Sequence, residues 1–296
     1  MLQYTSPIFI NLTKRCNFFC AYCFNNSSYS RKSSSYVIDN WDFVINQISS
    51  TSINEIRLSG GEPLLIENIG DICQSILSNN LSYTITTNGS LLNKNLEWIK
   101  RSPPTTLWLS YHKEYNNYKS FVYILSKINF PQTKIGVNIF LDDVVSNPIL
   151  GNLFSNQIIK RFKVLYKTPL GRGNNQESNS GFSDIKLLIK KCMGKHKPEI
   201  RIESPLMKNG KIGINSCILK QRPLVTIDND GEIYKCCIAI NEKSSSLGNL
   251  SNNRLINILD NYNANLTTLP CKNILPNITK GVGTCPLSLI NLESIL

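Results

Sequence analysis

Short apolar runs alternate with amphipathic stretches along the first half of the chain. The runs predict strands at 7–12, 53–59, 82–87, 106–111, 134–141 and 160–166. The stretches between them have helical periodicity and predict helices at 37–50, 66–79, 93–101, 116–128 and, more briefly, 147–157. Six repeats of strand followed by helix or loop imply a parallel sheet covered by helices. Such a sheet is either an incomplete barrel or an open doubly wound sheet.

The pattern changes near residue 170. A polar segment rich in Gly, Asn and Ser, at 170–183, indicates a boundary loop, and no further strand–helix unit is expected beyond it. Residues 223–237 predict a β-hairpin that turns at Asn-Asp-Gly, and 250–262 predict a helix. We therefore expect a core at 1–172, a connecting segment at 173–210 and a small second domain at 211–296.

Composition and charge narrow the class of protein. Hydrophobic residues make up 41% of the chain and charged residues 18%, which fits a soluble globular protein. The N-terminus lacks the order of a secretory signal, and no apolar run approaches the ~20 residues of a membrane helix, so we expect a cytoplasmic protein. The net charge of +12 suits nucleic acid or an acidic peptide as partner. Without a helix-turn-helix cue or an aromatic–basic RNA-binding signature, nucleic acid is disfavoured.

The ten cysteines point to metal or redox chemistry, because the cytosol keeps thiols reduced and disfavours disulfides. The two histidines, His112 and His196, lie far in sequence from the first cysteine group, so mixed Cys/His zinc-finger spacing is absent there.

Three cysteines follow the first predicted strand within eight positions, namely Cys16, Cys20 and Cys23. A loop can wrap around a [4Fe–4S] cluster, whose usual ligands are cysteine thiolates. Three thiolates leave one iron open to a substrate or cofactor, as a catalytic zinc site keeps one position open. The same spacing also admits a zinc site completed by a distant ligand, or simply buried thiols.

Two further unusual stretches follow the next strands, SGGEP after the second and TTNG at the end of the third. Because the carboxyl ends of parallel strands share one edge, these stretches should meet the cysteine loop. The glycine pair lets the backbone pass close to a ligand, Glu62 offers a carboxylate to an ammonium group, and Thr87 and Asn88 can hydrogen-bond a ribose. Either stretch is also compatible with a plain turn, with Pro63 as an early helical residue.

CNFFCAYC, followed one strand–helix unit later by SGGEP, resembles the radical S-adenosylmethionine (SAM) enzymes, whose hallmark is CxxxCxxC after the first strand. The resemblance covers residues 7 to about 172 and implies an α/β fold, a partial (β/α)6 barrel. It also implies that Cys16, Cys20 and Cys23 hold a [4Fe–4S] cluster whose open iron is chelated by SAM. The implied cofactor contacts are Tyr22, Gly60, Gly61, Glu62, Pro63, Thr87, Asn88, Ser110 and Arg172.

In enzymes of this family, an electron from the reduced cluster cleaves SAM to methionine and a 5′-deoxyadenosyl radical. That radical abstracts a hydrogen atom from an unactivated carbon, while the protein supplies orientation and excludes water. The resemblance thus implies an electron donor such as flavodoxin or ferredoxin as a partner.

A second group of cysteines lies beyond the boundary loop. The hairpin brings Cys217 near Cys236, and Cys271 and Cys285 lie in loops that can complete four ligands. By residue count alone, four thiolates suit zinc as well as iron–sulfur. The order C-x13-G-x4-C with LGNL downstream resembles the extension called SPASM or, when shortened, twitch. The C-x2-C-x5-C-x3-C run of a full SPASM domain is absent, which implies one auxiliary [4Fe–4S] cluster, with Cys237 as an alternative to Cys236.

Three cysteines remain after these assignments: Cys73, Cys192 and Cys237. Cys73 lies in an apolar helical pattern, which predicts a core residue. In epimerases of the family that this chain resembles, a cysteine returns a hydrogen atom to the opposite face of the substrate radical. Cys237 and Cys192 are candidates for that role, and a buried or incidental thiol is the alternative for each.

The function implied by the resemblance is modification of a ribosomally made peptide by epimerisation, crosslinking or oxidation. A basic surface suits an acidic leader peptide, although no winged-helix peptide-recognition domain fits before Cys16. The first alternative is a dehydrogenase or epimerase of a small molecule such as a sugar or aminoglycoside. The second is a non-catalytic iron–sulfur or zinc-binding module, which leaves SGGEP and TTNG without a purpose.

Overall fold

The computed structural model describes residues 6–31, 35–128, 130–165, 196–203, 224–237, 239–241, 246–264 and 289–291. Within them, one sheet holds eleven strands in the order β10-β9-β8-β1-β2-β3-β4-β5-β6-β7-β11. The strands are Ile8–Asn11 (β1), Glu55–Ser59 (β2), Ser82–Thr87 (β3), Thr106–Ser110 (β4), Lys134–Phe140 (β5), Ile159–Leu165 (β6), Glu199–Glu203 (β7), Val225–Ile227 (β8), Glu232–Tyr234 (β9), Ser246–Asn249 (β10) and Leu289–Asn291 (β11).

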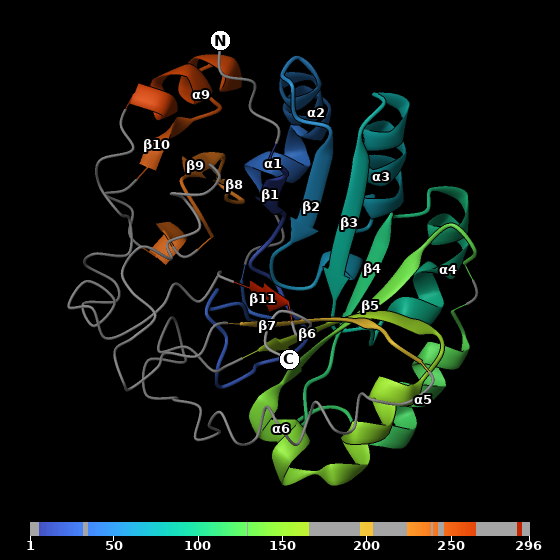
Figure 1. Cartoon of the computed structure of the whole chain (residues 1–296). Coiled ribbons are helices and arrows are strands. Elements are labelled where there is room, and N and C mark those ends of the chain that lie inside the picture. The colour runs from blue at the N-terminus through green and yellow to red at the C-terminus, as the bar shows by residue number, and fades with distance from the viewer. Residues whose placement is uncertain are drawn as a thin grey trace, which may run out of the picture.

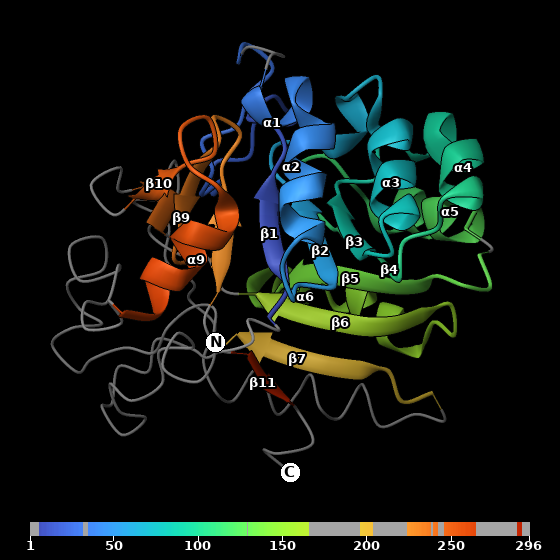
Figure 2. The same ribbon diagram turned by 90° about the horizontal axis from the view of Figure 1, so that it is seen from above.

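Strands β1 to β7 pair in parallel with their neighbours, and the strand direction turns progressively from β1 to β7 (Figure 1). Helices α2 to α5 lie together on the outer side of this curved sheet (Figure 2). The described α-helices are Tyr36–Asp39 (α1), Trp41–Ser49 (α2), Ile69–Ser78 (α3), Leu92–Arg101 (α4), Tyr118–Ser126 (α5), Leu141–Ser146 (α6) and Leu255–Ala264 (α9). The fold is therefore the predicted partial barrel of the α/β class.

The core lies between the sheet and its outer helices. Residues Ile56, Ile85, Leu107 and Val137 occupy the outward faces of four successive strands and are fully buried. The alternate positions of each strand face inward and are more polar, since successive side chains of a strand point to opposite faces. The apolar face thus stabilises the barrel, and the polar face is available for a ligand.

Local sequence explains where some elements differ from the prediction. The helix expected at 37–50 divides into α1 and α2 at Asn40, whose φ of −123° and ψ of 28° are not helical. The segment expected as a helix near 147–157 forms the 3-10 helix Pro148–Ser155 (η2), preceded by the short α6. A seventh parallel strand, β7, was not predicted, and it pairs with β6. Its sequence, EIRIE, has charged inward positions and lacks the apolar run of the earlier strands.

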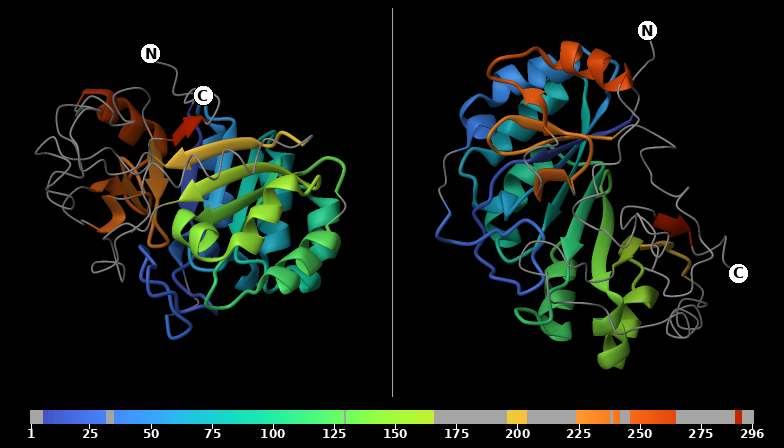
Figure 3. Two further views of the ribbon diagram at one scale, coloured as in Figure 1. Left: turned by 60° about the horizontal axis from the view of Figure 1, so that its bottom comes forward. Right: turned by 90° about the vertical axis from the view of Figure 1, so that its left-hand side faces the viewer.

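The predicted hairpin is present as β8 and β9, and it continues the barrel sheet, because β8 pairs in parallel with β1. Figure 3 shows this hairpin and α9 beside the N-terminal strand and helices. Strand β10, which was not predicted, pairs with β9, and the helix expected at 250–262 is α9, beginning at Leu255. The domain limits expected at 172 and 210 lie outside the described residues.

None of the helices in the described part of the chain combines the length and hydropathy needed to cross a membrane.

Candidate functional site

The SGGEP segment after β2 forms the floor of the cysteine loop. Gly61 N donates to Thr13 O at 2.5 Å, and Glu62 N donates to Arg15 O at 2.9 Å. A Cβ on Gly61 would lie 2.0 Å from Arg15 O, and Gly60 has a φ of +134°, which favours glycine. The glycines therefore allow two backbone segments to touch directly before the first cysteine.

The cysteine loop closes on itself at its far end. Cys16 N donates to Ser28 O and Ser28 N donates to Lys14 O, both at 3.1 Å. Cys16 and Cys20 are buried at 9% and 7% exposure, and Cys23 is half-buried. All three predicted cluster ligands therefore lie in one closed loop at the carboxyl end of β1.

Burial raises the pKa of the Cys16 thiol to about 11 and that of Cys20 to about 12, and the nearby charge of Cys23 raises both further. Iron ligation requires the thiolate, so the positive charge of the metal must displace these protons. Within the described residues, no three His, Cys, Asp or Glu side chains converge on one point as the ligands of a single metal ion do. In a cubane each cysteine binds a different iron, so three thiolates in a surrounding loop fit a [4Fe–4S] cluster.

Glu62 joins the ends of β2 and β3 beneath this loop. Its carboxylate is fully buried and accepts hydrogen bonds from Leu64 N at 3.0 Å, Thr87 Oγ1 at 2.7 Å and Asn88 N at 2.7 Å. Burial raises the pKa of Glu62, and these three donors act in the opposite direction. The side chains of Glu62 and Thr87 therefore bind each other here, and contact of either with a cofactor stays a prediction. Pro63 begins the short 3-10 helix Pro63–Leu65 (η1), as expected for an early helical residue.

Asn88 ties the TTNG turn to the cysteine loop. Its Nδ2 donates to Asn17 Oδ1 at 2.9 Å, while Asn17 Nδ2 donates to Ser90 Oγ at 2.8 Å. Ser90 N in turn donates to Asn88 Oδ1 at 2.9 Å. The three motifs at the carboxyl edge of the sheet are thus one hydrogen-bonded unit, as the strand order predicts.

His112 belongs to this unit, although the sequence places it 92 positions from Cys20. Its Nδ1 lies 3.0 Å from the Tyr22 hydroxyl and 3.6 Å from Cys20 Sγ. Burial lowers the pKa of His112 to about 4, so the imidazole is neutral at pH 7. The sequence analysis did not place His112 in the site. The signal for it was its position two residues after the end of β4, because the cysteines lie at the same edge of the sheet.

Ser110, at the end of β4, accepts a hydrogen bond from Asn138 Nδ2 at 3.2 Å. Asn138 is only 8% exposed, and its Oδ1 has no hydrogen-bond partner among the described residues. Buried polar atoms are generally paired, so this acceptor is suited to a donor group of a ligand. The predicted contact at Ser110 therefore has a neighbour that the sequence analysis missed.

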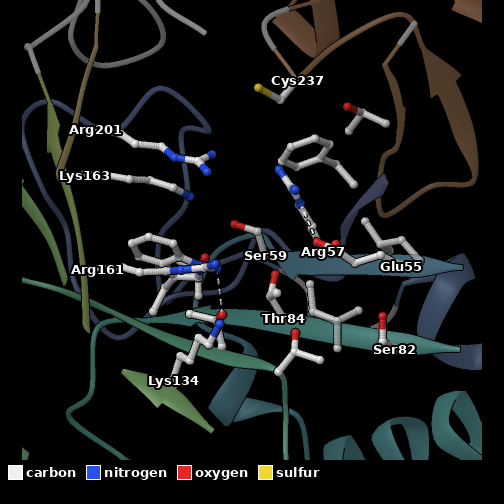
Figure 4. A pocket seen from close by; sticks show the side chains of 18 of the residues that line it. Glu55, Arg57, Ser59, Ser82, Thr84, Lys134, Arg161, Lys163, Arg201 and Cys237 are labelled. Carbon is white, nitrogen blue, oxygen red and sulfur yellow. Dashed lines mark hydrogen bonds and ion pairs between the residues drawn. The ribbon is translucent and has the colours of Figure 1, made fainter. Parts of the chain in front are cut away.

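A cavity of about 690 Å³ opens on the inner side of the barrel, lined from strands β1 to β8 (Figure 4). Its wall carries five cationic side chains and two carboxylates: Arg57, Lys134, Arg161, Lys163, Arg201, Glu55 and Glu199. The Glu55 carboxylate lies 2.8 Å from Arg57, and Glu199 lies 2.9 Å from Arg161. Positive charge therefore predominates around this space.

The two adjacent hairpin cysteines have different surroundings. Cys236 is buried at 4% exposure, whereas Cys237 is half-buried and lines the cavity, with its sulfur turned toward the open space in Figure 4. Cys73 is fully buried in α3, as expected for a core residue. The other predicted site residues lie outside the described residues: Arg172, Cys192, Cys217, Cys271 and Cys285.

Comparison with known proteins gives one family and several relatives. The family model described as Radical SAM superfamily matches residues 10–120, which include the cysteine loop, SGGEP and TTNG. The GTP 3′,8-cyclase of Clostridium perfringens (strain SM101 / Type A) is 26% identical over 257 residues, covering 77% of this chain and 79% of that relative.

Solved structures share the fold at low sequence identity. Streptococcus suis SuiB bound to S-adenosylmethionine aligns with a TM-score of 0.67 and 15% identity, covering 87% of this chain and 66% of that chain. SuiB bound to precursor peptide SuiA aligns with the same TM-score. BtrN in complex with AdoMet and 2-DOIA aligns with a TM-score of 0.54 and 15% identity, covering 95% of this chain and 89% of that chain.

Proposed function

We propose that this chain is an enzyme of the radical SAM superfamily that uses a [4Fe–4S] cluster and SAM, as the match of that family model to residues 10–120 supports. In this proposal Cys16, Cys20 and Cys23 hold the cluster, and the substrate occupies the barrel cavity. When bound, SAM and the reduced cluster supply a 5′-deoxyadenosyl radical that removes a hydrogen atom from an unactivated carbon. The observation that carries this proposal is the hydrogen-bonded unit of cysteine loop, SGGEP and TTNG. Phe24 and Ser59, which adjoin that unit in the sequence, line the barrel cavity.

The residues of the carboxyl edge bind and orient the cofactor in this proposal. The TTNG turn bonds to the cysteine loop through Asn88, and Ser110 at the end of β4 bonds to Asn138 in β5. Tyr22 packs edge-on against Phe140 with ring centroids 4.7 Å apart, which gives an aromatic wall next to Cys20. The glycine pair and Pro63 shape the backbone, and Arg172 stays a predicted contact.

The two hairpin cysteines take separate roles. We assign the buried Cys236 to the auxiliary cluster, together with Cys217, Cys271 and Cys285. We assign Cys237, which lines the substrate cavity, as the donor of a hydrogen atom to the substrate radical, with Cys192 as the alternative donor. The support for this division is the different exposure of two neighbouring thiols.

Two substrate classes follow from different observations. The SuiB structure with precursor peptide SuiA has the same fold, which supports a peptide whose residue enters the barrel and is epimerised, crosslinked or oxidised. A small molecule is favoured by the cavity itself, since about 690 Å³ is the size of a typical ligand pocket. An electron donor such as flavodoxin or ferredoxin and a cytoplasmic location, where thiols stay reduced, complete the proposal.

Reductive SAM cleavage tests the proposal directly. The reconstituted protein should yield 5′-deoxyadenosine under dithionite, and replacement of Cys16, Cys20 and Cys23 together by Ala should abolish the product. Cys73→Ala, a cysteine of the α3 core, is the matched control and should retain cleavage. Continued cleavage in the triple variant would remove the proposed site.

The hydrogen-atom donor is tested by isotope uptake. The product formed in deuterated solvent should carry deuterium with the parent protein and lose it in Cys237→Ala if Cys237 is the donor. Unchanged deuterium uptake in Cys237→Ala moves the assignment to Cys192, which Cys192→Ala checks in the same way.

A further inference from the structure

We propose that the substrate carries a compact, multiply charged anionic group that binds Lys163 and Arg201 on the β6–β7 wall of the barrel cavity. The inference rests on the proposed function, because it names the chemical class of what occupies the cavity. Phosphate and carboxylate groups share this chemistry.

Strand register brings the two cations together. Lys163 lies directly opposite Arg201 in the parallel pairing of β6 and β7, so their backbones are about 4.8 Å apart. Both side chains line the cavity, and Figure 4 shows them extending from one side into the space that Arg57 enters from the other. The Lys163 Nζ lies 3.9 Å from the centroid of the Trp108 ring, which positions the ammonium by a cation–π contact.

The charges on the wall do not cancel. The two glutamates that line the cavity contact its arginines: Glu55 contacts Arg57, while Glu199 contacts both Arg161 and Arg201. Among the described residues of the lining, cations exceed carboxylates by three. A concave wall with low-dielectric surroundings concentrates this positive potential. A group with several anionic oxygens is complementary to this potential.

The donors fit such a group. Arg201 presents a planar fork of N–H donors and is 44% exposed, so a ligand can reach it. Lys163 adds three N–H donors from the adjacent strand. Hydrogen bonds between these groups and anionic oxygens are charge-assisted and are the stronger kind.

The strand register also gives the position of Lys163 and Arg201 relative to the proposed cofactor contacts. Ser110, Asn138, Lys163 and Arg201 occupy one row across β4, β5, β6 and β7. Three strand spacings, about 14 Å, separate the ends of the row. The anionic group therefore binds at one end of the substrate, and the reacting carbon lies toward Ser110.

Binding to the holoenzyme in the presence of SAM tests the inference, measured anaerobically by titration calorimetry. The probes are inorganic tripolyphosphate, GTP and a hexaglutamate peptide. Affinity for at least one probe should fall by about tenfold or more in the Lys163→Gln/Arg201→Gln double variant. Lys160 is an exposed residue of β6 outside the described cavity lining, so Lys160→Gln removes the same charge from the same strand and should leave affinity unchanged, while Lys163→Arg should retain it.

The probes distinguish the source of the anion. Loss of tripolyphosphate or GTP binding identifies a phosphate group, and loss of hexaglutamate binding alone identifies the carboxylates of an acidic peptide. The inference is overturned if no probe binds, if the double variant binds like the parent, or if Lys160→Gln weakens binding equally. SAM cleavage without substrate is measured in the same samples. Its absence alongside intact anion binding counts against the proposed function and not against the anion site.

Discussion

Gly61 is the residue at which the backbone of SGGEP touches the backbone that leads into the cysteine loop. A Cβ at this position would collide with Arg15 O. The colliding atoms belong to the backbone, so no flexible side chain can move to make room. We expect Gly61→Ala to lower the free energy of unfolding by about 2 kcal/mol, because overpacking against backbone forces the two segments apart. Iron incorporation should fall as well, since the displaced segment carries Cys16.

Gly70→Ala separates these two effects. Gly70 lies in α3, where a new Cβ meets Trp98 at 3.0 Å and helix propensity gains about 1 kcal/mol. We expect this variant to stay near the parent in stability and to incorporate iron fully. Urea denaturation and iron analysis of both variants check the prediction, which fails if Gly61→Ala loads iron like Gly70→Ala.

Cys73 gives a pH dependence that is independent of the metal sites. Burial raises the pKa of its thiol from 9.0 to about 12, so above pH 9 the unfolded chain loses this proton while the folded chain keeps it. The folded state then binds more protons than the unfolded state, and stability falls as pH rises through this window. From about pH 8 to about pH 10.5 the loss from this group is about 2 kcal/mol. Denaturation under reducing conditions should show a drop smaller by that amount in Cys73→Ala than in the parent.

At the scale of the elements, Asp228 links the β8–β9 hairpin to β1 and to the segment that follows β1. This carboxylate is 2% exposed, accepts from Asn11 Nδ2 at 2.9 Å and lies 2.9 Å from Lys14 Nζ. Asp228→Ala leaves a buried amide and an ammonium without this partner, which costs about 1–3 kcal/mol. We expect hydrogen exchange of the β1 amides to accelerate, because β8 pairs with β1.

The same turn offers a control for that prediction. The Asp230 carboxylate is exposed and accepts a hydrogen bond from Glu232 N at 3.2 Å, so Asp230→Ala should change stability by less than about 1 kcal/mol. Equal exchange rates in β1 for the two variants would show that Asp228 does not hold the hairpin in place.

The elements also show how far the sequence alone could reach. In β2, Ile56 and Leu58 give the apolar face that predicts a strand, and the cysteine loop and TTNG follow strands as expected. The alternation of apolar and polar residues predicts which side chains share a face of a strand. It does not predict which strands pair with one another. The contact of Glu62 with Thr87 needs the register of β2 against β3, and the pairing of β8 with β1 joins residues more than 200 positions apart.

The cationic cavity could not be predicted for the same reason. Lys163 and Arg201 are 38 positions apart, and only the pairing of β6 with β7 sets them side by side. In the sequence they are two of the residues that make up a net charge of +12, and the sequence does not show where on the fold the positive charges gather. Likewise, Cys20 follows β1 and His112 follows β4, so their contact depends on the arrangement of the strands and not on spacing along the chain.

At the scale of the whole molecule, the hairpin joins the region of the second cysteine group to the barrel. Because β8 continues the sheet beyond β1, the hairpin that precedes Cys236 and Cys237 belongs to the barrel sheet, and Cys237 lines the cavity of that barrel. If the chain holds both proposed [4Fe–4S] clusters, about eight irons are expected after anaerobic reconstitution. Replacing Cys16, Cys20 and Cys23 by Ala should lower this to about four and abolish SAM cleavage.

The complementary variant removes the other cluster and leaves the first one loaded. Cys236→Ala should also lower the iron content to about four, but it should still produce 5′-deoxyadenosine, because the cysteine loop has its own backbone hydrogen bonds to Ser28 and Gly61. Metal analysis and electron paramagnetic resonance of both reduced variants distinguish the two clusters. Four irons in the parent, with no change in Cys236→Ala, would contradict the auxiliary cluster and leave the first site intact. Two zinc ions and no iron in the parent would contradict both sites, since zinc supplies no electron for SAM cleavage.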